Sequence, residues 1–115
     1  MRVCYAEEMN APQKTRRAML EEFVAASPND SFARYGLAME CSNGGDTAAA
    51  REHFRMLLEA HPEYVPGYFH FGQLLARTDG REAARKIFAD GVAAARKSGD
   101  AHALSELQAA LDELG

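Results

Sequence analysis

The sequence predicts an all-α protein built from stacked antiparallel helix pairs, and three observations support this. The chain has 115 residues, which suits a single domain. No segment alternates apolar and polar residues over a sustained run, so a sheet has no support. A shift of 34 residues lays Ala49–Phe54 over Ala83–Phe88 with four identities in six positions. The chain therefore contains a duplicated unit of about one helix pair.

The spacing of apolar residues and the turn signals define the first four helices. Apolar residues recur at intervals of three and four, which places each set on one helix face. The glycines of the segment 43–46 break this pattern, and Asp46 is suited to cap the helix that follows. Pro62 ends that helix, and Pro66 suits a first helical turn. These signals predict helices at residues 13–26, 31–43, 47–60 and 66–78.

The last two helices follow from similar signals. The segment 77–80, Arg-Thr-Asp-Gly, repeats the turn between the two helices of a pair. The segment 98–100, Ser-Gly-Asp, is suited to close one helix and cap the next. These signals predict helices at residues 81–97 and 101–114.

Small and large residues recur at matching places in the two units, and this pattern resembles the tetratricopeptide repeat (TPR) family. Short side chains allow two helices to approach closely, and large ones fill the gaps between them. The first unit carries Leu37, Ala38, Cys41, Gly45, Asp46, Ala50, Phe54, Leu57 and Pro62; the second carries Tyr68, Phe71, Gly72, Leu75, Ala84, Phe88 and Gly91. The resemblance implies a short right-handed α-α superhelix, a solenoid of helix pairs.

The resemblance also implies a domain organisation. It covers about residues 13–114, so residues 13–115 are expected to form a single TPR-like domain. Residues 1–12 are expected to be a tail or an accessory segment. The full repeats are expected at residues 31–64 and 65–98, with a C-terminal capping helix at 101–114. Residues 13–26 resemble the second helix of a degenerate unit.

Three residues depart from the family pattern. Arg34 stands at a position where the family usually has a large apolar side chain, so we expect one packing contact to be weakened or moved to Tyr35. Arg96 replaces the proline that ends a unit, so the helix at 81–97 is expected to run on by a turn. Gln108 takes the place of the small residue in the last helix.

Composition excludes several classes of partner and suggests a compartment. Thirteen Lys and Arg against 17 Asp and Glu leave a net charge of -4, so we expect neither nucleic acid nor a membrane surface as a partner. Two cysteines are too few for a disulfide scaffold, which favours the cytoplasm. Glu7 and Glu8 interrupt any signal-peptide-like stretch, and Met9 is an alternative start. Cys41 is expected to be buried and inert, whereas Cys4 is expected to be exposed on the tail.

No motif for catalysis, cofactor binding or metal binding is present in the sequence. The phosphate-binding, dinucleotide-binding, nucleophile-elbow and zinc-protease signatures are absent. The four histidines form no pair at a spacing of four, and no cysteine lies close to one in the sequence. Adjacent glutamates such as Glu21 and Glu22 point in different directions on a helix, so they cannot face each other as acid and base. We therefore expect no enzyme, no cofactor and no metal.

The candidate partner-binding site is the concave groove that the first helix of each unit lines in such a stack. Its expected residues are Phe32, Tyr35, Met39, Phe69, His70, Gln73, Arg77, His102 and Glu106. The four large side chains Phe32, Tyr35, Met39 and Phe69 form an apolar stripe, and exposed apolar surface often marks a binding site. The alternative is that the stripe is simply core, covered by the N-terminal segment or by contacts between helices.

The resemblance favours a non-catalytic adaptor or scaffold that binds a protein or peptide. One known use of the family is capture of a C-terminal carboxylate by a clamp of Lys, Asn and Arg. That clamp is absent here, and Glu106 would repel a carboxylate, so an apolar or amphipathic segment is the expected ligand. The alternative is self-association, in which apolar ends meet or the segment with Val3, Tyr5 and Met9 enters a neighbour's groove.

Overall fold

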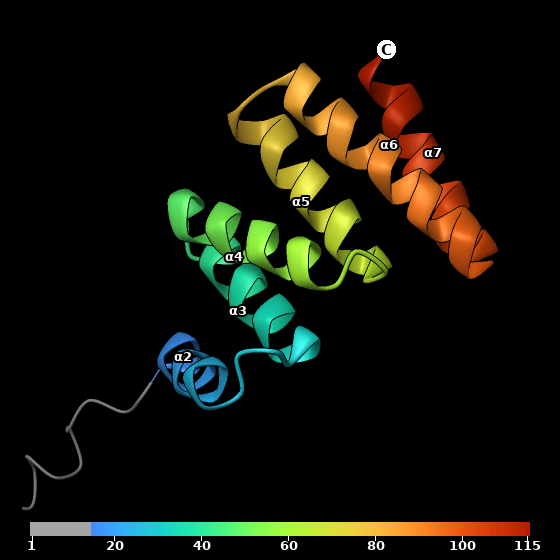
Figure 1. Cartoon of the computed structure of the whole chain (residues 1–115). Coiled ribbons are helices and arrows are strands. Elements are labelled where there is room, and N and C mark those ends of the chain that lie inside the picture. Colours follow the sequence, from blue (N-terminus) through green and yellow to red (C-terminus); the bar gives the residue numbers. More distant parts are fainter. Residues whose placement is uncertain (1–14) are drawn as a thin grey trace, which may run out of the picture.

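The computed structural model describes residues 15–115, and within that part of the chain all regular structure is helical (Figure 1). The helices are α2 (Arg16–Ala26), α3 (Ser31–Asn43), α4 (Thr47–Ala60), α5 (Val65–Thr78), α6 (Arg81–Ser98) and α7 (Ala101–Leu114). Each lies within a few residues of the helix that the sequence predicts. The all-α fold class is confirmed.

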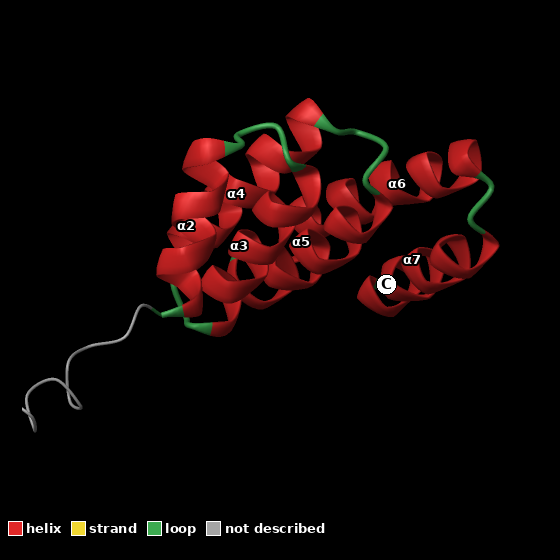
Figure 2. Cartoon of the chain, turned by 90° about the horizontal axis from the view of Figure 1, so that it is seen from below, coloured by secondary structure: helices red, strands yellow, loops and turns green. Residues whose placement is uncertain are grey.

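The helices form two rows (Figure 2). One row holds α3, α5 and α7, and the other holds α4 and α6, with α2 at the N-terminal end. Helices that are neighbours in sequence pack against each other, and α5 also contacts both α3 and α7. We call the row of α3, α5 and α7 the first-helix face, because α3 and α5 are the first helices of the two hairpins, α3 with α4 and α5 with α6, and α7 continues the row.

Side-chain caps fix where several helices begin. Asp30, Asp46 and Asp100 each accept a hydrogen bond from the backbone N–H three residues on, so they satisfy donors that a helix start leaves unpaired. Thr15 caps α2 in the same way, which explains why this helix starts at Arg16 rather than at residue 13. Gly99 takes the left-handed conformation (φ 75°) after α6, and a glycine adopts it without steric cost.

Small residues allow the two helices of each hairpin to approach closely, as the sequence predicts. Ala38 and Ala50 have no exposed surface in the first hairpin, α3 with α4. In the second hairpin, α5 with α6, a Cβ added at Gly72 would lie only 2.4 Å from the ring of Phe88. The position therefore admits no side chain while that ring stays in place.

Arg34 occupies the position at which the sequence predicts a packing contact that is weakened or moved to Tyr35. It is buried, with 8% of its surface exposed. Its guanidinium donates to the carbonyl oxygen of Pro28 (3.3 Å) and lies 3.1 Å from Nδ1 of His53 on α4. The lost apolar contact is thus replaced by hydrogen bonds that tie the α2–α3 turn to α4. Tyr35 packs elsewhere, on α5 and its preceding turn.

Two further sequence predictions are confirmed, and others lie outside the described residues. Cys41 is fully buried, and burial raises the pKa of its thiol, which keeps it in the unreactive protonated form. Helix α6 has 18 residues against 14 for α4, which is the extra turn expected when Arg96 replaces proline. The predictions for the N-terminal segment, Cys4 and Met9 fall within residues 1–14, outside the described part.

Candidate partner-binding surface

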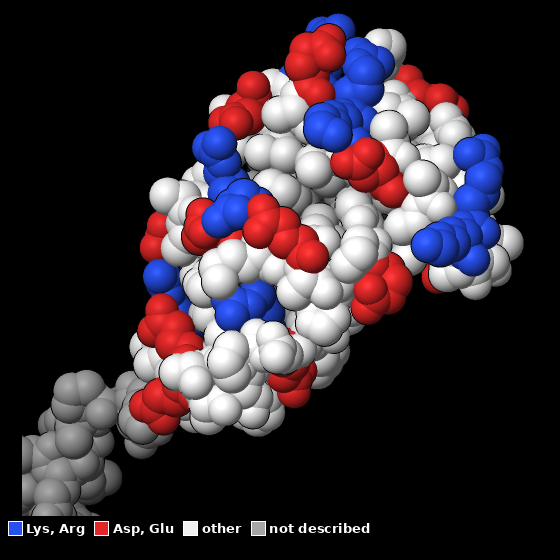
Figure 3. Space-filling view, viewed as in Figure 1, with Lys and Arg blue, Asp and Glu red and all other residues white. Residues whose placement is uncertain are grey.

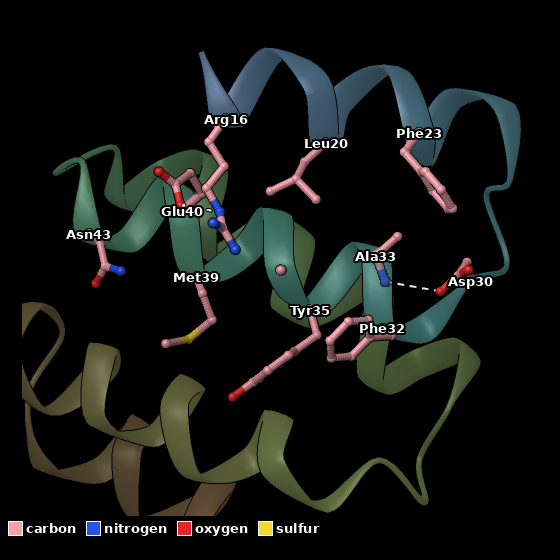
Figure 4. Close-up of a pocket in the computed structure, with 11 residues that line it drawn as sticks. Arg16, Leu20, Phe23, Asp30, Phe32, Ala33, Tyr35, Met39, Glu40 and Asn43 are labelled. Carbon is pink, nitrogen blue, oxygen red and sulfur yellow. Dashed lines mark hydrogen bonds and ion pairs between the residues drawn. The ribbon is translucent and has the colours of Figure 1, made fainter.

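The apolar end of the predicted groove is a hollow of about 550 Å³ between α2 and α3 (Figure 4). We call it the α2–α3 hollow. Leu20 and Phe23 point into it from α2, and Arg16 closes one end through an ion pair with Glu40 (3.4 Å). Its α3 side includes Phe32, Tyr35, Gly36 and Met39, so three of the predicted stripe residues line it.

The apolar stripe divides into an exposed part and a half-buried part. Phe32 has 74% of its surface exposed. Tyr35, Met39 and Phe69 are half-buried and pack against the core. The stripe therefore combines both of the interpretations that the sequence left open, because most of it supports the core while its outer edge stays accessible.

Aromatic rings join α3 to α5 across the first-helix face. The ring of Tyr35 lies 5.3 Å from that of Tyr64 and 5.8 Å from that of His70, measured between centroids. Phe69 meets His70 edge-on at 5.4 Å. Such tilted and edge-on contacts are favourable for aromatic pairs. The structure brings Tyr35 and His70 together between α3 and α5, where their rings stabilise the junction between the hairpins. Phe69 contacts His70 on its own helix and Phe88 on α6, with ring centroids 6.4 Å apart.

Burial determines the protonation state of His70 and Tyr35. It lowers the pKa of His70, although the carboxylate of Glu106 on α7 opposes the shift. It also raises the pKa of Tyr35. Both side chains are therefore neutral at pH 7, and the centre of the first-helix face offers apolar rings rather than charge.

The polar end of the predicted site lies on α5 and α7. Gln73 and Arg77 line a second hollow, which α7 closes with Ala110 and Leu114. The guanidinium of Arg77 also donates to the hydroxyl of Ser42 on α3 (3.3 Å). His102, with 84% of its side chain exposed, lies 3.5 Å from Glu106, so these two residues form a solvated pair at the far end of the face.

Sequence reasoning missed the contribution of α2 and of one turn residue. The sequence predicts a degenerate helix at residues 13–26 but does not indicate that Leu20 and Phe23 on it belong to the site. Tyr64 lies in the turn before α5, where no helical periodicity marks it. The signal for α2 was present, because Leu20 and Phe23 recur at the helical spacing of three.

The opposite row of helices presents a different surface. Over α4 and α6, Lys and Arg are interspersed with Asp and Glu (Figure 3). Several of these charges are paired, such as Arg51 with Asp79 and Lys86 with Asp90. Among residues 15–115 no cluster of three or more His, Cys, Asp or Glu has the form of a metal site. No helix in that range is long and apolar enough to cross a membrane.

The fold defines a class of protein, the α-helical repeat proteins, in which successive hairpins stack on their neighbours. Known proteins identify the family. The chain is 38% identical to a tetratricopeptide repeat domain protein of Salinibacter ruber, whose crystal structure superposes with a TM-score of 0.70 over 74% of this chain and 94% of that one. The solution structure of that domain gives a TM-score of 0.73 over 76% and 89% of the two chains, also at 38% identity.

Two further relatives agree. A solution structure of a protein from Bordetella parapertussis has 27% identity and a TM-score of 0.76 over 89% of each chain. A TPR repeat-containing protein of Pseudomonas aeruginosa is 28% identical over 95 residues, which are 83% of this chain and 90% of that protein. No family model matches the sequence. The chain belongs to the tetratricopeptide repeat family, and this membership supports a protein-interaction module in general.

Proposed function

We propose that this protein is a non-catalytic adaptor that binds an apolar or amphipathic segment of a protein partner on its first-helix face. The observation that carries the proposal is the row of aromatic and apolar side chains on α3 and α5. Phe32 is its most exposed member, and the neutral Tyr35 and His70 lie at its centre. A cytoplasmic location fits this role and stays a prediction.

The polar residues at the other end of the face suit the rest of such a segment. Gln73 and Arg77 offer hydrogen-bond donors, and His102 and Glu106 form an exposed pair. Charged and polar contacts at the rim set orientation, whereas buried apolar contacts supply most of the affinity. Each large apolar side chain that leaves water contributes about 1.5–3 kcal/mol before the cost of association, so a micromolar ligand is expected.

A peptide-display experiment tests this proposal. The immobilised protein selects ligands from a library of random peptides, and their affinities are then measured for variants by fluorescence anisotropy. The double variant Phe32→Ala/Tyr35→Ala is expected to lose at least about tenfold in affinity, which corresponds to roughly 1.4 kcal/mol. Because Tyr35 is half-buried, circular dichroism must show that the variant is folded. Phe32→Ala alone removes an exposed ring and carries less risk to the fold.

The matched control is Met19→Ala, which removes an exposed apolar side chain from α2 outside the residues that line the α2–α3 hollow. It is expected to leave the affinity unchanged. Equal binding by the double variant, or an equal loss in the control, contradicts the proposal.

Self-association is a second candidate, favoured by one observation. Phe23 and Phe32 are both exposed at the same end of the molecule, beside the α2–α3 hollow. Light scattering from micromolar to millimolar concentration tests it, and a strict monomer throughout that range eliminates it.

A further inference from the structure

The buried guanidinium of Arg34 fixes the protonation state of a histidine on the next helix. It donates to the carbonyl oxygen of Pro28 in the α2–α3 turn (3.3 Å) and lies 3.1 Å from Nδ1 of His53 on α4. A guanidinium carries only donors and stays charged in proteins. Nδ1 of His53 must therefore accept the hydrogen bond, so the ring is neutral and carries its proton on Nε2.

A proton taken up by His53 removes this acceptor. Both nitrogens of the charged ring are donors, so Nδ1 would then point a hydrogen at the guanidinium. The two groups would also carry the same charge at a separation of 3.1 Å. Because like charges repel strongly where water is scarce, the contact between Arg34 and His53 cannot persist in that state.

The surroundings of His53 favour the neutral ring. The charged groups that face it come from three helices: Arg17 and Glu21 on α2, Arg34 on α3, and Asp46 at the start of α4 with Glu52 within it. Burial is the largest influence and lowers the pKa of His53, and the two arginines lower it further, against the carboxylates. The contact is therefore intact at pH 7. It is lost as the pH falls below the ordinary pKa of 6.5 and passes through the lowered value.

The α2–α3 turn is held to α4 at two places, which respond differently to a proton. Pro28 is held through Arg34 and His53. Asn29 is held directly, because Nε2 of His61 donates to its carbonyl oxygen (2.9 Å). That nitrogen also carries a hydrogen in a charged ring, so the bond to Asn29 survives protonation. Acid thus weakens the attachment at Pro28 and leaves the one at Asn29.

Helix α2 has few other attachments near this turn. Val24 is its buried residue, and among the described helices α2 packs against α3. Two ion pairs fix its first turn, Arg16 with Glu40 (3.4 Å) and Arg17 with Asp46 (2.9 Å). The hydrogen bond from Arg17 lowers the pKa of Asp46, so that pair keeps its charges in mild acid. The C-terminal end of α2, which leads into the turn, therefore depends most on the attachment at Pro28.

We propose that Arg34 and His53 form a pH-sensitive switch, in which uptake of one proton by His53 releases the C-terminal end of α2 from the first hairpin. Phe23 lies at that end of α2 and belongs to the wall of the α2–α3 hollow, near Asp30 (Figure 4). Release of this end thus changes the shape of the hollow. The inference is independent of the proposed function, because it concerns contacts within the chain and requires no partner.

Nitrogen NMR of the histidine rings tests the closed state on the unmodified protein. The ring signals are assigned through their bonds to the backbone and recorded at pH 7.5. His53 is expected to be neutral, with its proton on Nε2. A proton on Nδ1 of His53 at this pH contradicts the proposal.

Hydrogen exchange of backbone amides tests the release. Rates are measured at pH 7.5 and pH 5 and corrected for the intrinsic effect of pH on exchange. Protection of the last turn of α2, residues 23–26, is expected to fall at least about threefold at pH 5. A one-proton equilibrium shifts by up to about tenfold for each pH unit below the folded-state pKa.

Two histidine variants show whether His53 causes the fall. His53→Gln keeps an acceptor for Arg34 and does not titrate, so residues 23–26 are expected to stay protected at pH 5. His61→Gln is the matched control, because it changes the other histidine that holds the turn, and it is expected to show the same fall as the unmodified protein. Circular dichroism must show that each variant is folded at both pH values.

Three outcomes overturn the proposal. An equal fall in His53→Gln means that another group controls the end of α2. Unchanged protection in the unmodified protein means that the contact does not hold this end. Unfolding of the whole unmodified protein at pH 5 means that protonation acts on the entire fold rather than on one helix end.

Discussion

The two complete hairpins fill an equivalent buried position with different side chains. Tyr68 in the second hairpin and Arg34 in the first lie 34 residues apart in sequence, and each has 8% of its surface exposed. Tyr68 donates its hydroxyl to the carbonyl oxygen of Pro62 (2.7 Å), and Arg34 donates to that of Pro28 (3.3 Å). Each donor thus binds the proline carbonyl six residues before it.

The comparison shows what this position requires. It needs a long side chain that fills the space between helices and ends in a donor for the proline carbonyl. A phenol meets both needs by itself. A guanidinium carries more donors and a charge, so it needs further acceptors when it is buried. In the first hairpin His53 and the sulfur of Met56 provide them.

The largest expected effect concerns the contact of Gly72 with Phe88 in the second hairpin, where the first hairpin has Ala38 and Phe54 at the equivalent positions. Phe88→Ala is expected to lower the free energy of unfolding by about 3–5 kcal/mol, because it leaves a cavity in the core. Gly72→Ala alone is expected to cost about 1–3 kcal/mol through overpacking against the ring. Urea denaturation of both single variants and the double variant checks this.

In the double variant the added methyl group enters the space that the ring has left. The double variant is therefore expected to lose less free energy of unfolding than the sum of the losses in the two single variants. Strict additivity would show that the ring moves aside at little cost, and that the close approach at Gly72 does not constrain the second hairpin.

A smaller effect on stability is expected at the position that Arg34 holds in the first hairpin and Tyr68 holds in the second. Arg34→Leu removes the hydrogen bonds to Pro28 and His53 and is expected to cost about 1–3 kcal/mol. Tyr68→Phe removes a single hydrogen bond and is expected to cost about 1 kcal/mol. Thermal and urea denaturation measure both. Arg34→Tyr is the matched control, because it restores the donor found in the second hairpin; a loss equal to that of Arg34→Leu would show that the hairpins are not equivalent here.

The smallest effect is a pH dependence shared by the two hairpins. Burial lowers the pKa of His53 in the first hairpin, with a further contribution from Arg34, and it lowers the pKa of His70 in the second. The unfolded chain takes up protons at these residues near their ordinary pKa of 6.5, whereas the folded chain takes them up only at a lower pH. Stability is therefore greatest above pH 6.5 and falls as the pH drops through the lowered pKa values.

The variants His53→Gln and His70→Gln are each expected to reduce the slope of stability between pH 7 and pH 5. Denaturation midpoints measured across this range give the slope. An unchanged slope in both variants would mean that other groups produce it.

The helices could be predicted from the sequence because their signals are local. Asp46 and Asp100 cap helices, and Gly99 ends one, within a few residues of the elements that they define. The 34-residue repeat then predicted how helices pair. Burial of Cys41 followed from the apolar face that it shares with Leu37.

The candidate site could be predicted only in part because it depends on contacts between hairpins. Sequence spacing put Phe32 and Tyr35 in one stripe. It did not show that Tyr35 packs on Tyr64 and His70 while Phe32 stays in solvent, because that outcome depends on how α3 crosses α5. The partners of Arg34 lie 6, 19 and 22 residues away, in the α2–α3 turn and on α4, which no local pattern reveals.

The connectivity of the helices has a consequence for how the chain folds. Helices pack only on neighbours one or two places along the chain, from α2 to α7. Chain segments that must meet are therefore close in sequence, and little loop entropy is lost before contacts form. Folding is expected to be fast, on the scale of microseconds to milliseconds that local topologies allow. Opening should begin at the two ends, so amide protons of α4 and α5 should exchange with solvent last.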